Sequence, residues 1–93
     1  MKIFVDDYRP APPGWTLAKT PGEAIALISR ATELKQVSLD FCLNEPEVYP
    51  GGIVANSFLI VACYLSTIRL KPKIYIHSDH PDGAQEMLTL LRT

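Results

Sequence analysis

The stretch MKIFVDDYRPAPPGWTLAKTPGEAIALISRA, residues 1–31, decides the fold of this chain. Residues 1–5 are a short, mostly apolar run with β-forming side chains that two aspartates end, so they predict a buried first strand. Three prolines and a glycine within residues 10–14 exclude a helix there, because each proline fixes φ and removes a hydrogen-bond donor. A second strand over residues 15–19 therefore follows the first without a helix between them.

A capped amphipathic helix comes next. Thr20 and Glu23 form a T-x-x-E capping box, and Pro21 suits the first helical turn. The apolar residues of one face then recur at helical spacing: Ala24, Leu27, Ile28 and Ala31. This spacing predicts a helix that packs on a sheet and ends near Leu34.

The second half of the chain alternates strands with helices. VSLD, residues 37–40, predicts a third strand, and the two prolines and two glycines of residues 44–52 predict a loop after it. KIYI, residues 73–76, predicts a fourth strand, and residues 82–91 carry a helical apolar face. The alternation demands a four-stranded, mainly parallel sheet with right-handed crossovers, an α/β class.

A helix between those two strands is expected to begin at Ile53 and to end at Leu70. It is apolar on nearly every side, and a chain of 93 residues can hardly bury such a helix by itself. One interpretation is a homodimer that covers this helix. The stretch from Val48 to Ile68 has no charged residue, but polar residues, prolines and glycines interrupt it. Its apolar part therefore falls short of the roughly 20 residues that a membrane span needs.

Length, charge and cysteine spacing indicate how many domains the chain has and which kinds of partner it lacks. With 93 residues, 47% of them apolar, the chain supports one core and hence a single domain over residues 1–93. Nine basic residues balance ten acidic ones without a basic run, so no extended nucleic-acid surface is expected. Cys42 and Cys63 have no redox or zinc spacing, and the N-terminus lacks the long apolar run of a signal peptide. We therefore expect a cytoplasmic protein with reduced cysteines.

Acidic side chains follow two of the predicted strands. Asp6 and Asp7 come directly after the first strand and Asp40 ends the third, and ligands of open parallel sheets bind at such carboxyl ends. Three gathered carboxylates would repel one another unless a cation neutralises them, and their oxygens suit Mg²⁺. The simpler interpretation is that these aspartates only cap turns.

Four further residues could act on a phosphate. His77 follows the fourth strand and could transfer a proton, although it could also be satisfied by a loop carbonyl. Arg9 has the forked geometry of phosphate recognition, or it forms an ordinary surface salt bridge. Ser78 could bind a phosphate oxygen or cap the last helix, and His80 could bind phosphate or merely lie outside that helix.

The strings VDD, WTLAKTPGEAIALI, VSLD and IYIHSDHPDGAQEM together resemble the cyclic-phosphate processing receiver-like domains, small relatives of two-component receiver domains. The resemblance implies a flavodoxin-like, three-layer sandwich from which the first crossover helix and the last strand are missing. It also implies Mg²⁺ on Asp6, Asp7 and Asp40, completed by the backbone carbonyl of Cys42. Action on cyclic phosphate ends would use the aspartates with His77 and Ser78.

One departure from the family pattern bears on activity. After Asp40 the family commonly has a histidine, a second aspartate and a glycine, whereas this chain reads Phe41-Cys42-Leu43-Asn44. The first hypothesis remains a metal-assisted phosphoesterase with His77 and Asp40 as catalytic residues, acting on a small phosphorylated ligand or a nucleotide or RNA end. The alternative is a catalytically inactive module that binds a partner or a phosphorylated ligand. Signalling through phosphorylation of Asp40 is a third option, weakened by the absence of a fifth strand and its lysine.

Overall fold

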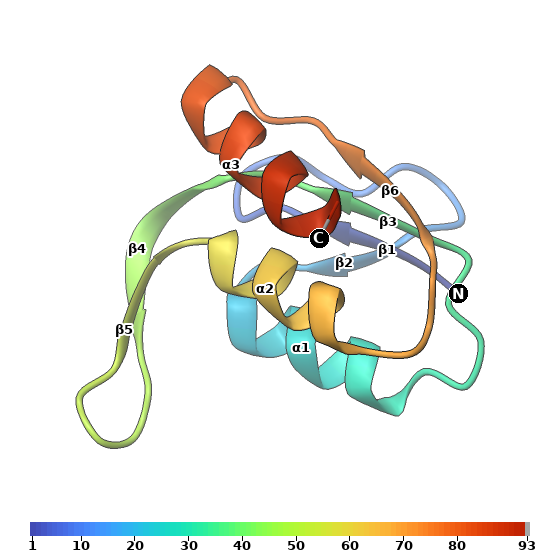
Figure 1. Ribbon diagram of the computed structural model, residues 1–93, viewed down its shortest axis with the longest axis horizontal. Helices are drawn as coiled ribbons and strands as arrows, with labels where there is room; N and C mark the ends of the chain where they lie inside the picture. The colour runs from blue at the N-terminus through green and yellow to red at the C-terminus, as the bar shows by residue number, and fades with distance from the viewer. Residues whose placement is uncertain (93) are drawn as a thin grey trace.

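The computed structural model describes residues 1–92, which form a four-stranded parallel sheet, a two-stranded hairpin and three helices (Figure 1). The parallel strands lie in the order β2-β1-β3-β6. Their bounds are Lys2–Val5 for β1, Thr16–Ala18 for β2, Gln36–Leu39 for β3 and Lys73–Ile76 for β6. All four strands occur where the sequence predicts them, so the receiver-like α/β class is confirmed.

Helix α1, Pro21–Arg30, starts as the capping box predicts. The Thr20 hydroxyl accepts a hydrogen bond from the backbone N–H of Glu23 at 3.1 Å, while the Glu23 carboxylate accepts one from the N–H of Lys19. The helix ends four residues before the expected Leu34. Ala31 already has extended backbone angles, and this exit lets Leu34 bury its side chain in the core from the following link.

The expected loop over residues 44–52 and the early start of the second helix are wrong. Residues Cys42–Val48 form β4 and Val54–Ser57 form β5, an antiparallel hairpin that projects from the body in Figure 1. Gly51 and Gly52 have φ of +88° and +81°, which allows the tight reversal between the strands. These glycines therefore form the tip of a hairpin and do not belong to a long loop.

Helix α2 spans only Leu59–Thr67, shorter at both ends than the expected helix from Ile53 to Leu70. The Ser57 hydroxyl accepts a hydrogen bond from the backbone N–H of Leu59, where the helix begins. Helix α3, Pro81–Arg92, agrees with the sequence prediction. None of the helices within residues 1–92 is long and apolar enough to cross a membrane.

The helices cover one face of the sheet. Ile3, Val5, Val37 and Leu39 are fully buried between the strands and the helices, and α2 packs against both α1 and α3 (Figure 1). On the opposite face, the proline-rich β1–β2 link stands in place of the first crossover helix, whose loss the resemblance implied, and it brings Trp15 edge-on to Phe4. This face of the sheet remains partly open because the link contains no helix. With helices on one face only, the sheet has two layers, and the expected third layer is absent from residues 1–92.

Candidate functional site

Asp6, Asp7 and Asp40 converge at the carboxyl ends of β1 and β3. Each offers a carboxylate oxygen, and these oxygens all lie within 4.8 Å of one another. The convergence follows from the register, since Val5 lies opposite Leu39 and the N–H of Asp40 donates to the carbonyl of Val5 at 2.9 Å. The predicted meeting of the three side chains is therefore what the structure shows.

Asp6 is the most buried carboxylate of the cluster, with no solvent exposure. One carboxylate oxygen accepts hydrogen bonds from the N–H groups of Tyr8 at 2.8 Å and Arg9 at 3.0 Å. The other lies 3.3 Å from the Arg9 guanidinium and 3.0 Å from Nε2 of His77. Burial alone would raise the pKa of Asp6, but these donors outweigh burial and hold the pKa below its usual value.

Asp40 has the opposite character. It is only 7% exposed, and burial, reinforced by the nearby charge of Asp6, raises its pKa even though the N–H of Phe41 donates to it at 2.8 Å. Its second carboxylate oxygen has no hydrogen-bond partner among residues 1–92. Asp7 uses one oxygen to accept a 2.6 Å hydrogen bond from the N–H of Asn44. Asp40 therefore has an oxygen free to bind a ligand.

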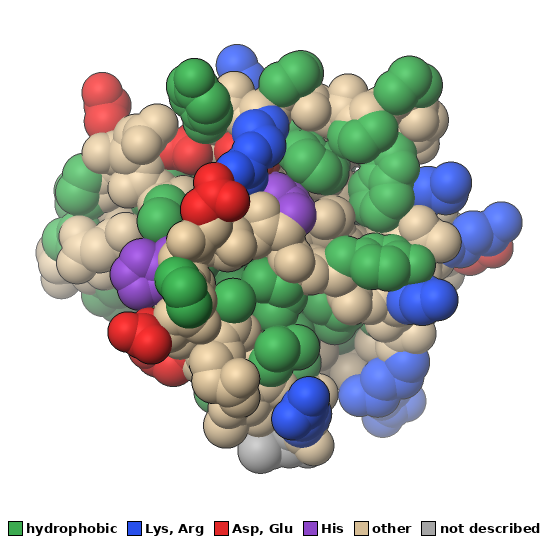
Figure 2. Space-filling view, turned by 90° about the horizontal axis from the view of Figure 1, so that it is seen from above, with side chains coloured by type: hydrophobic (Ala, Val, Ile, Leu, Met, Phe, Trp, Pro, Cys, Tyr) green, Lys and Arg blue, Asp and Glu red, His purple; other side chains and the backbone are tan. Residues whose placement is uncertain are grey.

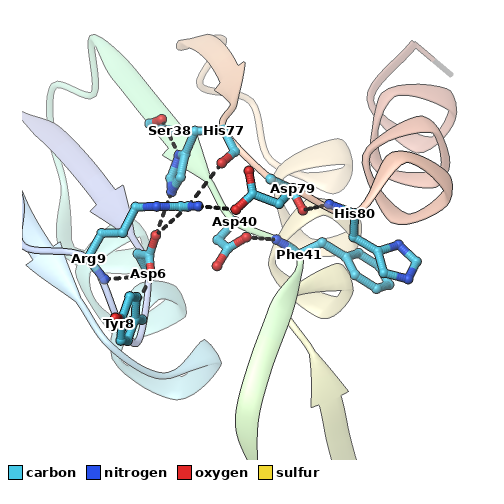
Figure 3. Close-up of polar contacts among 10 residues, drawn as sticks. Asp6, Tyr8, Arg9, Ser38, Asp40, Phe41, His77, Asp79 and His80 are labelled. Atoms are coloured by element: carbon cyan, nitrogen blue, oxygen red, sulfur yellow. Dashed lines mark hydrogen bonds and ion pairs between the residues drawn. The ribbon is translucent and has the colours of Figure 1, made fainter.

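Arg9 spans the site from β1 toward the end of β6, as Figure 3 shows. One guanidinium nitrogen contacts Asp6 and donates to the backbone carbonyl of His77 at 3.1 Å, and the other donates to Asp79 at 2.5 Å. The two carboxylates are very different partners, because Asp6 is fully buried whereas the Asp79 side chain is 89% exposed. The contact with Asp79 is the one that a phosphate could most readily replace.

These residues surround a pocket of about 160 Å³. Its lining consists of Asp6, Asp7, Tyr8, Arg9, Asp40, Cys42, Asn44 and Asp79. Asp79 had no predicted role, although its position just after the fourth strand was a signal that could have assigned one. Of the residues predicted to act here, Arg9 and the three aspartates line this pocket, and His77, Ser78 and His80 lie outside its lining.

His77 lies behind Asp6 on the open face of the sheet. Its ring stacks on Phe4 with centroids 4.4 Å apart. Nδ1 lies 2.6 Å from the hydroxyl of Ser38, and Nε2 faces Asp6 (Figure 3). In a neutral ring, Nε2 donates to the Asp6 carboxylate and Nδ1 accepts the proton of Ser38. Ser38 was missed, although it precedes Asp40 by two residues and strand alternation puts both on one face.

Ser78 and His80 have structural partners at the start of α3. The Ser78 hydroxyl accepts a hydrogen bond from the N–H of His80 at 3.0 Å, and Nδ1 of His80 accepts one from the N–H of Gly83 at 2.9 Å. The His80 ring also stacks on Phe41, with centroids 5.0 Å apart. His80 therefore caps the helix with its ring, a role that the sequence did not indicate, and the Ser78 hydroxyl binds the backbone of the residue before the helix.

The donor set fits a hard cation. Asp6, Asp7, Asp40 and Asp79 place four carboxylates beside a single guanidinium, and the donors are oxygens of the kind that Mg²⁺ prefers. The cluster whose ligand atoms lie together consists of the three carboxylates of Asp6, Asp7 and Asp40 and includes neither a thiolate nor an imidazole. The residues present therefore match Mg²⁺ better than zinc.

A family model described as "Cyclic-phosphate processing Receiver domain" matches residues 1–93, the whole chain. Neither a curated protein nor a solved structure matches significantly.

Proposed function

Since the chain belongs to the family of cyclic-phosphate processing receiver domains, we propose that it is a metal-assisted phosphoesterase that opens a cyclic phosphate at a nucleotide or RNA end. The observation that carries this proposal is the pocket in which Asp6, Asp7 and Asp40 meet the guanidinium of Arg9. Carboxylates for a cation beside a forked donor for phosphate oxygens are what phosphate chemistry requires.

The reaction would be a hydrolysis. Water adds to phosphorus, one ring P–O bond breaks, and the products are a phosphate monoester and a free hydroxyl. One proton leaves the attacking water and one reaches the departing oxygen, so no other reactant is consumed. The demands on the protein are to hold the phosphate, to balance its charge and to accept and return a proton.

Asp6, Asp7 and Asp40 would hold the Mg²⁺, and the bound ion would supply charge neutralisation at the phosphate oxygens. Arg9 would exchange its exposed contact with Asp79 for two oxygens of the substrate, keeping its contact with the buried Asp6. Asp40 is the candidate to accept the proton of water, because one of its carboxylate oxygens has no hydrogen-bond partner among residues 1–92.

His77 takes a different role in this proposal from the direct proton transfer that the sequence indicated. Both of its ring nitrogens are engaged, by Ser38 and by Asp6, so the ring orients the Asp6 carboxylate from behind. We therefore treat His77 as a positioning residue. Ser78 and His80 are omitted from phosphate binding because their side chains hydrogen-bond to the backbone at the start of α3.

The test is hydrolysis of 2′,3′-cyclic nucleotides in the presence of Mg²⁺, comparing the natural chain with Asp40→Asn. We expect Asp40→Asn to lose at least 100-fold in kcat/KM, the scale of losing a general base. Asp82→Asn, which removes an exposed carboxylate from the first turn of α3, serves as the matched control and should keep full activity. Equal activity of the natural chain and Asp40→Asn would contradict the proposal.

A second candidate function is a silent phosphate-binding module, and the placement of Phe41 favours it. The Phe41 ring packs against Gly83 and His80 at the position where the family commonly has a polar residue. Such a module would bind a phosphorylated ligand through Arg9 without turning it over. Calorimetry with a phosphate monoester distinguishes the two, since binding that Arg9→Ala abolishes, in a chain without hydrolytic activity, would favour the module.

A further inference from the structure

The open face of the sheet is organised in three rows that run across the strands. Because the strands are parallel and in register, residues on this face align every second position. The basic row contains Lys2, Gln36 and Lys73. The aromatic row contains Leu17, Phe4, Ser38 and Tyr75. The acidic row, at the strand ends, contains Asp6, Asp40 and His77.

The aromatic row presents ring surfaces beside cations. Tyr75 is 41% exposed, and Phe4 and Trp15 are half-buried. The ammonium of Lys73 lies 5.5 Å from the centroid of Tyr75, and that of Lys2 lies 5.7 Å from the centroid of Trp15. Proteins that bind single-stranded nucleic acids stack bases on accessible aromatic rings and contact the phosphates with neighbouring cations, and Tyr75 beside Lys73 offers that combination.

Charge is segregated along the same direction. Figure 2 shows this side of the molecule, with Lys and Arg side chains along one margin, hydrophobic side chains beside them, and a histidine next to acidic and basic groups further in. The formal net charge of −1 conceals this arrangement, because the basic row and the acidic row cancel in the sum. A polyanion would be attracted to the basic row, and at the acidic row it would need a cation to balance the carboxylates.

The acidic row adjoins the aromatic row directly. His77 donates to Asp6 with one ring nitrogen while its ring stacks on Phe4. Through His77, the pocket that contains Asp6 is therefore continuous with the aromatic row. The basic row lies four residues from the acidic row, or about 13 Å along a parallel strand. That span accommodates more than a single phosphate group.

We propose that this face binds a short single-stranded RNA, with bases stacked on Tyr75 and on Trp15 beside the aromatic row, and an upstream phosphate held by Lys2 and Lys73. The placement of the RNA end in the pocket rests on the proposed function, whereas the binding surface itself does not. A surface of this size holds two or three bases, as four-stranded sheets with exposed aromatics do elsewhere. It is therefore compatible with the expectation that the chain has no extended nucleic-acid surface.

Binding is measured by fluorescence anisotropy with a 5′-fluorescein-labelled hexauridylate that ends in a 3′ hydroxyl, in buffer with MgCl₂. This probe has no cyclic phosphate, so binding is scored whether or not the chain hydrolyses anything. We expect Tyr75→Ala to weaken binding about tenfold, the effect of losing one stacked base. Tyr75→Phe keeps the ring and should bind like the natural chain.

The salt dependence tests the lysines. Removing Lys2 and Lys73 together, as K2A/K73A, should lower the slope of log K against log salt by about 1.4, since each phosphate of a single strand contributes about 0.7. The matched control R30A/R92A removes two exposed charges from the ends of α1 and α3 and should leave the slope unchanged. Urea unfolding of each variant confirms that it is folded before its binding is compared.

Several results would overturn this inference. The first is that the hexamer does not bind, and the second is that it binds equally well to Tyr75→Ala and K2A/K73A. The third is that this face forms a homodimer, which Tyr75→Ala dissociates and which prevents RNA from binding. Hexamer binding in a chain that hydrolyses no cyclic nucleotide would support the surface and contradict only the proposed reaction. Hydrolysis of a 2′,3′-cyclic mononucleotide without hexamer binding would support the proposed reaction and contradict the RNA-binding surface.

Discussion

Two neighbouring carboxylates in the pocket have pKa values displaced in opposite directions, and their partners explain why. Asp6 accepts four donors and keeps its charge despite full burial. Asp40 is buried with one donor and lies next to the charge of Asp6, so its charged form is disfavoured. At neutral pH, Asp6 therefore stabilises the fold as a carboxylate, while the charge of Asp40 opposes folding until a cation or ligand compensates it.

Removal of that charge should stabilise the metal-free protein. Because the folded pKa of Asp40 lies above its unfolded value, its favourable contribution is complete below the unfolded carboxyl pKa of about 3.9 and is lost as pH rises through the folded pKa. Asp40→Asn keeps an oxygen for the Phe41 N–H and should raise the free energy of unfolding at pH 7 by about 1 kcal/mol. Urea unfolding in EDTA measures this change.

The gain from Asp40→Asn should shrink as pH falls through the folded pKa of Asp40, because the natural side chain then becomes neutral too. Mg²⁺ should raise the Tm of the natural chain and have little effect on Asp40→Asn, because a ligand stabilises only the state that binds it. Asp6 behaves in the opposite sense, since its contribution is present above about pH 3.9 and is lost as pH falls through its lowered folded pKa. An Asp40→Asn protein less stable than the natural chain at pH 7 without metal would refute this account.

Among the elements, α3 is held to the sheet by a residue that departs from the family pattern. The Phe41 ring fills the space above Gly83, where an added Cβ would lie 2.3 Å from Cγ of the ring. The His80 ring, at the N-terminus of the helix, stacks on the same side chain. Phe41 therefore has a packing role that fixes the start of α3 against the end of β3.

A pair of substitutions separates packing from helix propensity at this contact. Gly83→Ala should lower the free energy of unfolding by roughly 1–3 kcal/mol in the natural chain, because the new methyl group overpacks against Phe41. In a Phe41→Ala background, the same change should raise it by about 1 kcal/mol, since alanine favours a helix more than glycine does. Chemical denaturation of the four proteins gives both values, and equal effects of Gly83→Ala in the two backgrounds would rule out the contact.

The hairpin is the element that sequence patterns failed to reveal. Residue Glu47 of β4 accepts a hydrogen bond from the N–H of Gly22 at 2.8 Å, so the hairpin is tied to the N-terminus of α1 by a contact 25 residues apart in sequence. Pro46 and the glycines of the turn suggested a loop, yet an isolated two-stranded ribbon tolerates proline on its open edge. The helical assignment of residues 53–57 failed because their apolar residues fit a strand equally well.

At the scale of the whole molecule, the homodimer through α2 stays a prediction, and the apolar surface that supports it is smaller than the sequence indicated. Val61, Ala62 and Leu65 are buried within the chain's own core, with α1 and α3 on either side of the helix. Cys63 remains exposed, beside Leu59 in a shallow groove between α2 and α3. Less apolar surface therefore needs cover than the sequence implied.

Sedimentation velocity over a hundredfold range of concentration tests this dimer. If α2 forms the interface, the natural chain should shift to a dimer at high concentration, and Cys63→Asp should keep it monomeric, because a buried, unpaired carboxylate is costly. Arg30→Asp changes a side chain at the end of α1 and provides the charged control. A natural chain that stays monomeric at every concentration would contradict the prediction.

The sequence by itself determined the four parallel strands, the capped start of α1 and the meeting of Asp6, Asp7 and Asp40. Each of these follows from local patterns and from the rule that parallel strands end at the same edge. Only the tertiary structure decided that His77 lies between Asp6 and Ser38, 71 and 39 residues away, and that Arg9 contacts Asp79. Those contacts depend on which way side chains turn once strands are packed, and strand position alone does not specify it.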